Sequence, residues 1–144
     1  MSFQYIIESG EFLRDGHIFM YGYAGRDGGK NNPLMTYVKD IGPLPCGSYT
    51  IGDPYNDESL GPVCFKLEPD QSNQMFGRSL FRIHADSIAH PGDASHGCIV
   101  SLGLGKLTGR ACRENLASIV QAGDRNLKVV QRRTDALWVG SSMN

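Results

Sequence analysis

The sequence predicts a mainly β domain, folded as a sandwich or a barrel, with one principal α-helix near residues 109–122. Short apolar segments recur along the chain, and clusters of Gly, Pro, Asn and Asp separate them, as in all-β domains. Only one segment has the apolar spacing of an amphipathic helix. The 144 residues include no internal repeat and no linker-like tract, so we expect residues 1–144 to form a single domain.

The N-terminal part is predicted to begin with a strand and a hairpin. Polar and apolar side chains largely alternate over residues 2–8, which indicates a half-buried strand. In the segment 11–21, Asp15 and Gly16 separate two apolar runs, which is the strongest short signal for a β-hairpin. The glycine-rich stretch 22–33 is predicted to be a loop.

The rest of the chain is predicted to form further short strands and the helix. The strands are expected over residues 48–52, 63–68, 80–84 and 126–131. Thr108 is expected to cap the start of the helix and Gly123 to end it, and Trp138 to anchor a C-terminal segment. The helix is predicted from apolar residues spaced i, i+4, i+7 and i+8, namely Cys112, Leu116, Ile119 and Val120.

The charge balance argues against nucleic-acid partners. The chain carries 14 Lys and Arg and 15 Asp and Glu without long runs of one sign, for a formal net charge of −1. Nucleic-acid and polybasic membrane surfaces need clustered positive charge. No apolar run approaches the roughly 20 residues that span a bilayer, and residues 1–8 lack the basic leader and apolar centre of a signal peptide. We therefore expect no membrane insertion and no cleaved leader.

The four cysteines show neither a C-x-x-C pair nor the spacing of a zinc ribbon. Cys64 and Cys112 stand in apolar patterns and are predicted to pack as small core residues. A disulfide between Cys46 and Cys64 is left open by the sequence. Cys98 differs from the others because it stands in a small turn, directly after Ser95, His96 and Gly97.

Cys98 and His84 predict thiolate acyl-transfer chemistry. Cys98 ends the segment Ser-His-Gly-Cys at 95–98, and His84 stands fourteen residues before it in a strand-like segment. A thiolate is the nucleophile in such chemistry, and a histidine within hydrogen-bond reach generates it near neutral pH. We favour His84 as the base. His96 stays an alternative, because strand positions two apart share a face and His96 is two residues from Cys98.

The segment from His84 to Cys98 resembles the catalytic signature of the L,D-transpeptidase (YkuD-type) family. In that signature a histidine and a spacer precede Ser/Thr-His-Gly-Cys and an aliphatic residue. A second segment at 42–51, Gly-Pro-Leu-Pro-Cys-Gly-Ser-Tyr-Thr-Ile, looks like the family's Thr-Pro-x-Gly-x-Phe/Tyr-x-Ile motif. The two motifs stand in the family's order, and the resemblance covers about residues 15–131. It implies the β-sandwich or barrel-like catalytic fold of that family.

More closely, the chain resembles the small transpeptidase-like toxins of type VI secretion systems. Ile99 and Val100 follow the motif where chain-building enzymes usually place an arginine. The resemblance implies a substrate in peptidoglycan stem peptides, with the terminal D-amino acid of a tetrapeptide removed or exchanged, and no cofactor. It also implies synthesis in the cytoplasm, action in the periplasm of a target bacterium, and two partners, a cognate immunity protein and a component of the secretion apparatus.

The resemblance assigns roles to individual residues. Cys98 attacks the carbonyl before the terminal D-amino acid and forms a thioester, while His84 takes and returns the proton. The carbonyl of Ala85 is the implied acceptor for the other ring nitrogen of His84, and Asp86 is a rival. The backbone N–H groups of Gly97 and Cys98 are expected to form the oxyanion hole.

Other residues are expected to build the walls of the site. His96 is the implied wall residue, and Ser95 is expected to support it by a hydrogen bond. Arg82 and Tyr23 are expected to contact substrate, with Asp86 beside them. The competing interpretation is a solvent-facing or packing role, which applies equally to Arg110, Arg113, Tyr21 and Tyr37.

Three alternative hypotheses come from other classes of function. The chain could be a cell-wall L,D-transpeptidase of its own host, or a pseudo-enzyme that binds wall peptides without cleaving them. A metal-binding module is the third, because three imidazoles and a thiolate can form a tetrahedral site. Its ligands would be His84, His90, His96 and Cys98.

Overall fold

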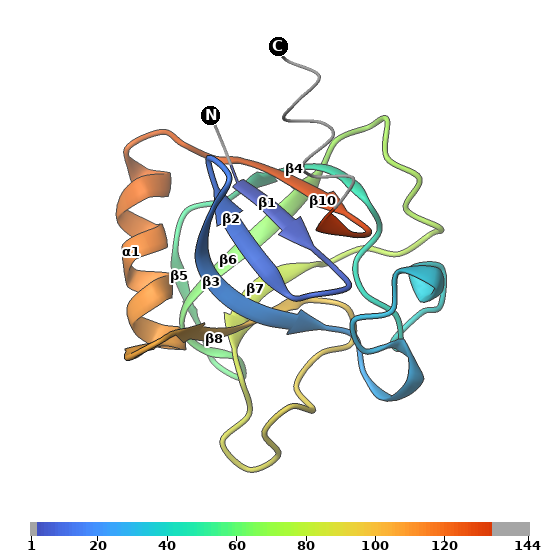
Figure 1. Cartoon of the computed structure of the whole chain (residues 1–144), viewed down its shortest axis with the longest axis horizontal. Helices are drawn as coiled ribbons and strands as arrows, with labels where there is room; N and C mark the ends of the chain where they lie inside the picture. Colours follow the sequence, from blue (N-terminus) through green and yellow to red (C-terminus); the bar gives the residue numbers. More distant parts are fainter. Residues whose placement is uncertain (1–2, 134–144) are drawn as a thin grey trace.

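A computed structural model of the chain describes residues 3–133. Within this range the chain forms a closed mixed barrel of eight strands, with one α-helix packed on its outside (Figure 1). The prediction of a mainly β domain with one helix is confirmed, and the sheet closes as a barrel. The elements are β1 (Phe3–Ile6), β2 (Glu11–Arg14), β3 (His17–Ala24), β4 (Gly47–Ile51), β5 (Tyr55–Asp57), β6 (Gly61–Pro69), β7 (Arg82–Ala85), β8 (Ile99–Leu104), β9 (Leu107–Thr108), α1 (Gly109–Gln121) and β10 (Asn126–Val130), with two short 3-10 turns at Asp27–Gly29 and Pro33–Met35.

The barrel follows the order β3-β2-β1-β10-β4-β6-β7-β8, and the pairing of β8 with β3 closes it. The pairs β1–β10 and β7–β8 are parallel, and the other pairs are antiparallel. The short strands β5 and β9 extend the sheet beside β6 and β8. Strands from the two ends of the described chain, β1 and β10, therefore lie next to each other (Figure 1).

The predicted hairpin joins β2 to β3. Asp15 and Gly16 have φ values of 51° and 83°, the left-handed pair that a tight two-residue hairpin turn requires. Inside the barrel, the aromatic rings of β1 to β3 form a cluster in which Phe3 and Phe12 have ring centroids 5.4 Å apart. Tyr5 and Phe12 are fully buried, so this cluster anchors the N-terminal strands to the core.

The helix α1 ends within one residue of its predicted end. The Thr108 hydroxyl accepts a hydrogen bond of 3.0 Å from the N–H of Ala111, which confirms the predicted cap. Cys112, Leu116 and Val120 are buried and join the core, against β8 and β6. No helix within the described range is long and apolar enough to cross a membrane.

Two predictions differ from the structure at the point where the barrel closes. Gly22 was expected to begin a loop, but β3 continues through it to Ala24 and pairs with β8. A Cβ at Gly22 would lie 2.5 Å from the carbonyl oxygen of Val100, so the missing side chain lets β8 approach. The strand β8 itself was not predicted, because it is buried on both faces near its start and its sequence does not alternate.

Two smaller predictions concern cysteine and tryptophan. Cys64 and Cys112 are buried, as predicted, and Cys64 carries a free thiol, so the Cys46–Cys64 disulfide is not formed. Trp138 lies outside the described residues.

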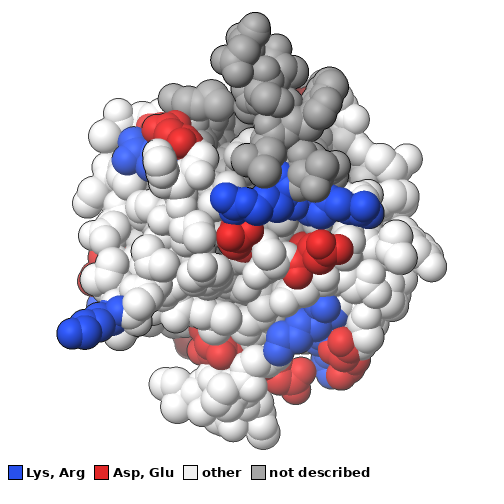
Figure 2. Space-filling model, viewed as in Figure 1, with Lys and Arg blue, Asp and Glu red and all other residues white. Residues whose placement is uncertain are grey.

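On the face seen in Figure 2, basic and acidic side chains are interspersed.

Candidate active site

The parallel strands β7 and β8 bring the predicted catalytic residues together. His84 lies on β7 opposite Val100 of β8, and Ile83 lies opposite Ile99. Cys98 immediately precedes β8, so this register places it beside Arg82 at the start of β7. The backbone N–H of Arg82 donates a hydrogen bond of 3.3 Å to the sulfur of Cys98. No motif predicted this backbone donor, which stabilises a thiolate at that position.

One cavity of about 430 Å³ opens at this end of the two strands. Cys98, His84, His96 and Arg82 all line it, so the structure brings four of the predicted site residues to one place. Lys39 and the loop residues after position 76 complete its wall. The cavity therefore has room for a ligand directly beside a thiol and an imidazole.

His84 is held in one orientation. Its side chain is only 2% exposed, and Nδ1 lies 2.7 Å from the carbonyl oxygen of Ala85. A carbonyl only accepts, so Nδ1 carries the proton and Nε2 keeps the free lone pair that a base needs. Burial lowers the pKa of His84, the Ala85 hydrogen bond opposes this shift, and the charges of Arg113 and Arg82 add to it. The imidazole is therefore neutral near pH 7.

Asp86 is not the orienting partner of His84. Its carboxylate accepts hydrogen bonds from the Tyr23 hydroxyl at 2.5 Å and from the N–H of Gly92 at 3.0 Å. Tyr23 is 2% exposed, and its hydroxyl oxygen accepts from the N–H of Ala94 at 2.9 Å. The structure thus places Tyr23 and Asp86 in a network that fixes the loop 86–95. Neither of these two residues lines the cavity.

Ser95 organises the turn before the nucleophile. It is fully buried, and its hydroxyl accepts from the N–H groups of Gly25 at 2.8 Å and Gly97 at 3.0 Å. The same hydroxyl donates to the carbonyl of Cys98 at 2.6 Å. Two predictions are corrected here. Ser95 bonds to backbone groups instead of the His96 side chain, and the Gly97 N–H already has an acceptor, which leaves the Cys98 N–H as the predicted oxyanion donor.

Gly97 occupies a position that only glycine fits. Its φ of +140° is unfavourable for other residues. A Cβ at this position would lie 2.6 Å from Nη2 of Arg78 and 2.7 Å from Cε1 of Phe81. The glycine of the motif therefore permits close packing behind the nucleophile.

Arg78 is the main residue of the site that sequence reasoning missed. It lies between two predicted strands, in the largely polar stretch 69–79, which carries no motif. Its side chain lines the cavity although the residue is only 7% exposed. It donates to backbone carbonyls of two segments that are far apart in the sequence, including that of His96 at 3.1 Å and that of Pro43 at 2.8 Å.

The cavity holds Cys98 as a neutral thiol. Burial raises the pKa of Cys98, while the hydrogen bond from the Arg82 N–H and the positive charges of Arg82 and Arg78 oppose that shift. With a neutral His84 beside it, the resting pair is thiol and imidazole. A thiol and a neutral imidazole can form an ion pair only by transfer of the thiol proton to the imidazole.

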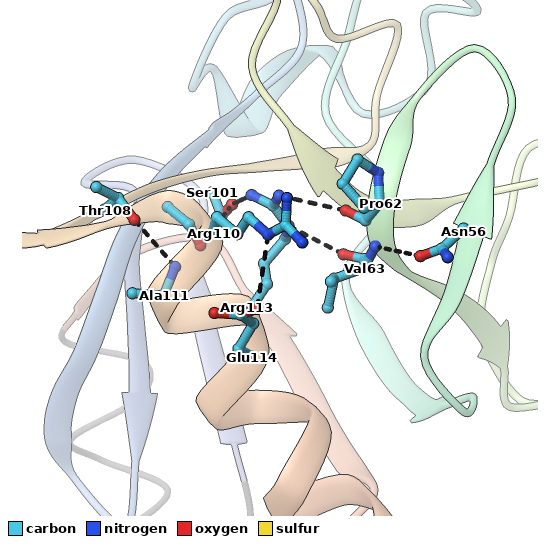
Figure 3. A network of polar contacts seen from close by, with 10 residues as sticks. Asn56, Pro62, Val63, Ser101, Thr108, Arg110, Ala111, Arg113 and Glu114 are labelled. Carbon is cyan, nitrogen blue, oxygen red and sulfur yellow. Dashed lines mark hydrogen bonds and ion pairs between the residues drawn. The ribbon is translucent and has the colours of Figure 1, made fainter.

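Arg113 supports the site from behind. It was expected to face solvent or to bind substrate, but it is 3% exposed and does not line the cavity. Figure 3 shows its guanidinium between α1 and the start of β6, where it donates to Ser101 Oγ at 2.6 Å and to the Val63 carbonyl at 2.9 Å. Ser101 Oγ in turn lies 3.4 Å from the carbonyl oxygen of His84. The network thus joins α1 to the strand that carries the base.

The remaining candidates lie elsewhere. His90 is exposed on the loop 86–95, and Arg110 pairs with Glu114 on the surface of α1 at 3.6 Å. Tyr21 is 40% exposed on β3. Tyr37 is 63% exposed and packs edge to face against Phe76.

The donor arrangement does not favour the metal-binding alternative. Over residues 3–133, no group of three or more His, Cys, Asp or Glu side chains is placed to hold a metal ion. Of the four proposed ligands, His84, His96 and Cys98 line the cavity, whereas His90 is exposed and does not line it. The geometry fits acyl transfer by a thiol and a base better.

Comparison with known proteins identifies the family. A search of curated proteins and a search of solved structures each found no match. The family model described as Tlde1 domain matches residues 19–103, which is more than half of the chain and includes both Cys98 and His84. The chain therefore belongs to the Tlde1 domain family, a family of type VI secretion toxin effectors.

Proposed function

We propose that this protein is a cysteine-dependent enzyme that modifies peptidoglycan. It removes the terminal D-amino acid from tetrapeptide stems, or exchanges it, through a thioester on Cys98. The observation that carries the proposal is that Cys98 and His84 line one cavity while His84 Nδ1 is held by the Ala85 carbonyl. Membership of a toxin family and the resemblance to L,D-transpeptidases support the same chemistry.

The first half-reaction forms the acyl-enzyme. His84 Nε2 takes the proton of the Cys98 thiol as the sulfur attacks the carbonyl carbon before the terminal D-amino acid. The tetrahedral intermediate collapses, the carbon–nitrogen bond breaks, and the leaving amine takes the proton from His84. The Cys98 N–H is the proposed donor to the developing oxyanion. The product of this step is a thioester and a free D-amino acid.

The second half-reaction depends on the acceptor. When water enters, His84 takes its proton, the hydroxide attacks the thioester, and the tripeptide leaves as a carboxylate while the thiol is restored. When the amine of another D-amino acid enters, the same sequence gives an exchanged stem. Both outcomes use the same two residues, so one site serves carboxypeptidase and transpeptidase reactions.

Charged groups in the cavity support a substrate that ends in a carboxylate. Arg82 lines the cavity beside Cys98, and Lys39 lies in the same wall. A guanidinium binds a carboxylate through two parallel hydrogen bonds, which fixes its direction as well as its charge. Asp40 lines the cavity as well and offers an acceptor for an amino group of the stem. We propose that Arg82 binds the terminal carboxylate of the stem.

The proposed site of action is the periplasm of a target bacterium, where the stem peptides are exposed. A type VI secretion apparatus would deliver the protein there, and a cognate immunity protein would protect the producing cell. The protein should therefore be toxic when targeted to the periplasm of a test strain. It should be harmless when kept in the cytoplasm, where its substrate is absent.

The decisive experiment uses purified muropeptides and mass spectrometry. Wild-type protein is expected to convert tetrapeptide stems to tripeptides with release of D-alanine, or to replace that residue when another D-amino acid is added. The Cys98→Ala variant should be inactive with an unchanged circular dichroism spectrum, because the change removes little packing. Ser72→Ala is the matched control and should retain activity, because Ser72 is exposed and does not line the cavity. Unchanged stems after incubation with wild type would refute the proposal.

A further inference from the structure

The peptide groups around the nucleophile are held from several directions. The Gly97 N–H donates to Ser95 Oγ at 3.0 Å, and the Gly97 carbonyl accepts from the Leu44 N–H at 3.0 Å. The Cys98 carbonyl accepts from the Ser95 hydroxyl at 2.6 Å. The His96 carbonyl accepts from Nη2 of Arg78 at 3.1 Å. These four bonds come from three residues, Ser95, Leu44 and Arg78, and Arg78 is the one that is charged.

Arg78 also holds a second segment, the loop 36–43. Its Nη1 donates to the carbonyls of Thr36 at 2.6 Å and Pro43 at 2.8 Å, and its Nη2 donates to that of Gly42 at 2.8 Å. The segment between Thr36 and Gly42 supplies Lys39 and Asp40 to the cavity wall. One guanidinium therefore joins the substrate-facing loop to the turn that carries the nucleophile.

A buried arginine bonded to carbonyls is an unusual choice for packing alone. Burying a positive charge is costly, and the acceptors that the described residues offer it through hydrogen bonds are neutral carbonyls. Burial accordingly lowers the pKa of Arg78. A neutral side chain would avoid the cost of burying a charge. Arginine differs from such a side chain in its positive charge and in the several N–H donors of its planar guanidinium.

The guanidinium lies directly behind the nucleophile. It stacks over the Phe81 ring, with its carbon 5.1 Å from the ring centroid. Nη2 would be 2.6 Å from a Cβ at Gly97, the residue before Cys98. At this position the positive charge favours a thiolate and a developing oxyanion, and it contributes to holding down the pKa of Cys98.

We infer that Arg78 is a positioning residue for the Cys98 nucleophile. Its four hydrogen bonds fix the 96–98 turn against the loop 36–43, and its charge stabilises negative charge that develops at the sulfur. This inference rests on the proposed function for the role of Cys98. It adds a residue that lies outside both motifs of the resemblance.

The test separates geometry from charge with two variants. Arg78→Lys keeps the charge but cannot reach carbonyls in several directions, and Arg78→Gln loses the charge as well. Two properties are measured for each: steady-state D-alanine release, as kcat and KM, and the rate of Cys98 alkylation by iodoacetamide across pH. Circular dichroism and thermal unfolding establish that each protein is folded.

Both variants are expected to lower kcat by about 10- to 100-fold, because small displacements of a nucleophile cost rates of this order. KM should change by about twofold or less, since the four N–H donors of Nη1 and Nη2 are already bonded to backbone carbonyls. The pH midpoint of Cys98 alkylation should rise in Arg78→Gln and stay near the wild-type value in Arg78→Lys. Arg125→Gln is the matched control, because Arg125 also donates to a backbone carbonyl, that of Ile51 at 3.2 Å, but does not line the cavity. It should leave both properties unchanged.

A folded Arg78→Gln with wild-type kcat and an unshifted alkylation midpoint would overturn the inference. If that variant does not fold, Arg78→Lys decides, and a wild-type kcat in the lysine variant would overturn it. Alkylation needs no peptide substrate, so the two proposals fail separately. Wild-type protein that releases no D-alanine but keeps the Arg78-dependent alkylation midpoint would refute the proposed reaction and retain the role of Arg78.

Discussion

Removal of the Ser95 hydroxyl tests how the nucleophile turn is built. Ser95 is fully buried, and its hydroxyl serves two N–H donors and one carbonyl acceptor, those of Gly25, Gly97 and Cys98. Ser95→Ala leaves these three backbone groups without that partner, and each unsatisfied buried group costs about 1–3 kcal/mol. Taking about 1 kcal/mol for each, we expect the free energy of unfolding to fall by about 3 kcal/mol.

The assay is thermal and urea unfolding together with D-alanine release. For a domain of this size, 1 kcal/mol corresponds to about 3 °C in Tm, so Ser95→Ala should lower Tm by about 10 °C. We expect kcat to fall by about 10-fold or more in the fraction that stays folded, because the turn then loosens around Cys98. Ser72→Ala is the control, since that exposed hydroxyl should contribute about 0.5 kcal/mol or less. A Tm for Ser95→Ala equal to that of the control would show that the three bonds do not hold the turn.

Five further predictions follow, two on His84 and one each on Arg82, Gly97 and Arg113. Because burial lowers the pKa of His84, kcat/KM should rise with pH along a limb that lies below pH 6.5, and a limb centred above pH 7 would contradict a neutral imidazole base. The lowered pKa of His84 also makes the free energy of unfolding depend on pH. It should fall as the pH drops from 6.5 towards the native pKa of His84, because the unfolded chain then binds more protons than the folded chain. Urea titrations of His84→Gln should show a flatter pH dependence. Arg82→Gln should raise KM for tetrapeptides by about 10-fold or more, with circular dichroism unchanged, and an unaltered KM would remove Arg82 from substrate binding. Gly97→Ala should yield little folded or active protein because its Cβ would meet Arg78, whereas Gly61→Ala, where the structure leaves space for a Cβ, should show only the smaller cost of its own φ of +89°. Arg113→Met should lower the free energy of unfolding by about 3 kcal/mol, because it leaves the Ser101 hydroxyl and the Val63 carbonyl without their donor, and a loss below about 1 kcal/mol would mean that the network in Figure 3 is not structural.

Local signals in the sequence were sufficient to predict the elements that depend on residues close together in the chain. The turn at Asp15 and Gly16 needs a left-handed backbone at both positions, and Asp-Gly is a sequence that adopts this conformation readily. The helix has a cap, an apolar stripe and an end, and the structure places it at Gly109–Gln121. The strand pattern likewise predicted a mainly β domain, although alternation alone does not distinguish a sandwich from a barrel.

Closure of the barrel depends on contacts between distant segments, and local patterns miss it. Gly22 carries the composition of a loop, yet it lies in a strand because β8 approaches its backbone closely. β8 has no alternating pattern because α1 covers it on one side, where Ser101 is buried. The pairing of these two strands is visible only once the fold is known.

Some residues of the candidate site could be predicted from the sequence, and others could be found only in the structure. Cys98 and His84 were predicted from their motif and its spacing, and the Ala85 carbonyl from the family resemblance. The structure places Cys98 and His84 in the lining of one cavity, with His84 Nδ1 2.7 Å from the Ala85 carbonyl oxygen. Arg78 stands 20 residues before Cys98 outside any motif, and its role arises only from carbonyls of two separate segments. Arg113 was placed at the surface because arginine is rarely buried, and its burial reflects acceptors on β6 and β8.

The measurement that tests the central claim most directly is the mass of the protein during turnover. Wild-type protein mixed with tetrapeptide muropeptide and quenched in acid should carry an adduct equal to the stem without its terminal D-alanine, and peptide mapping should place it on Cys98. His84→Gln should slow formation of that adduct, because the thiol then lacks its base. D-alanine release by Cys98→Ala, or an adduct mapped to Cys46, Cys64 or Cys112 in the active protein, would contradict a thioester at Cys98.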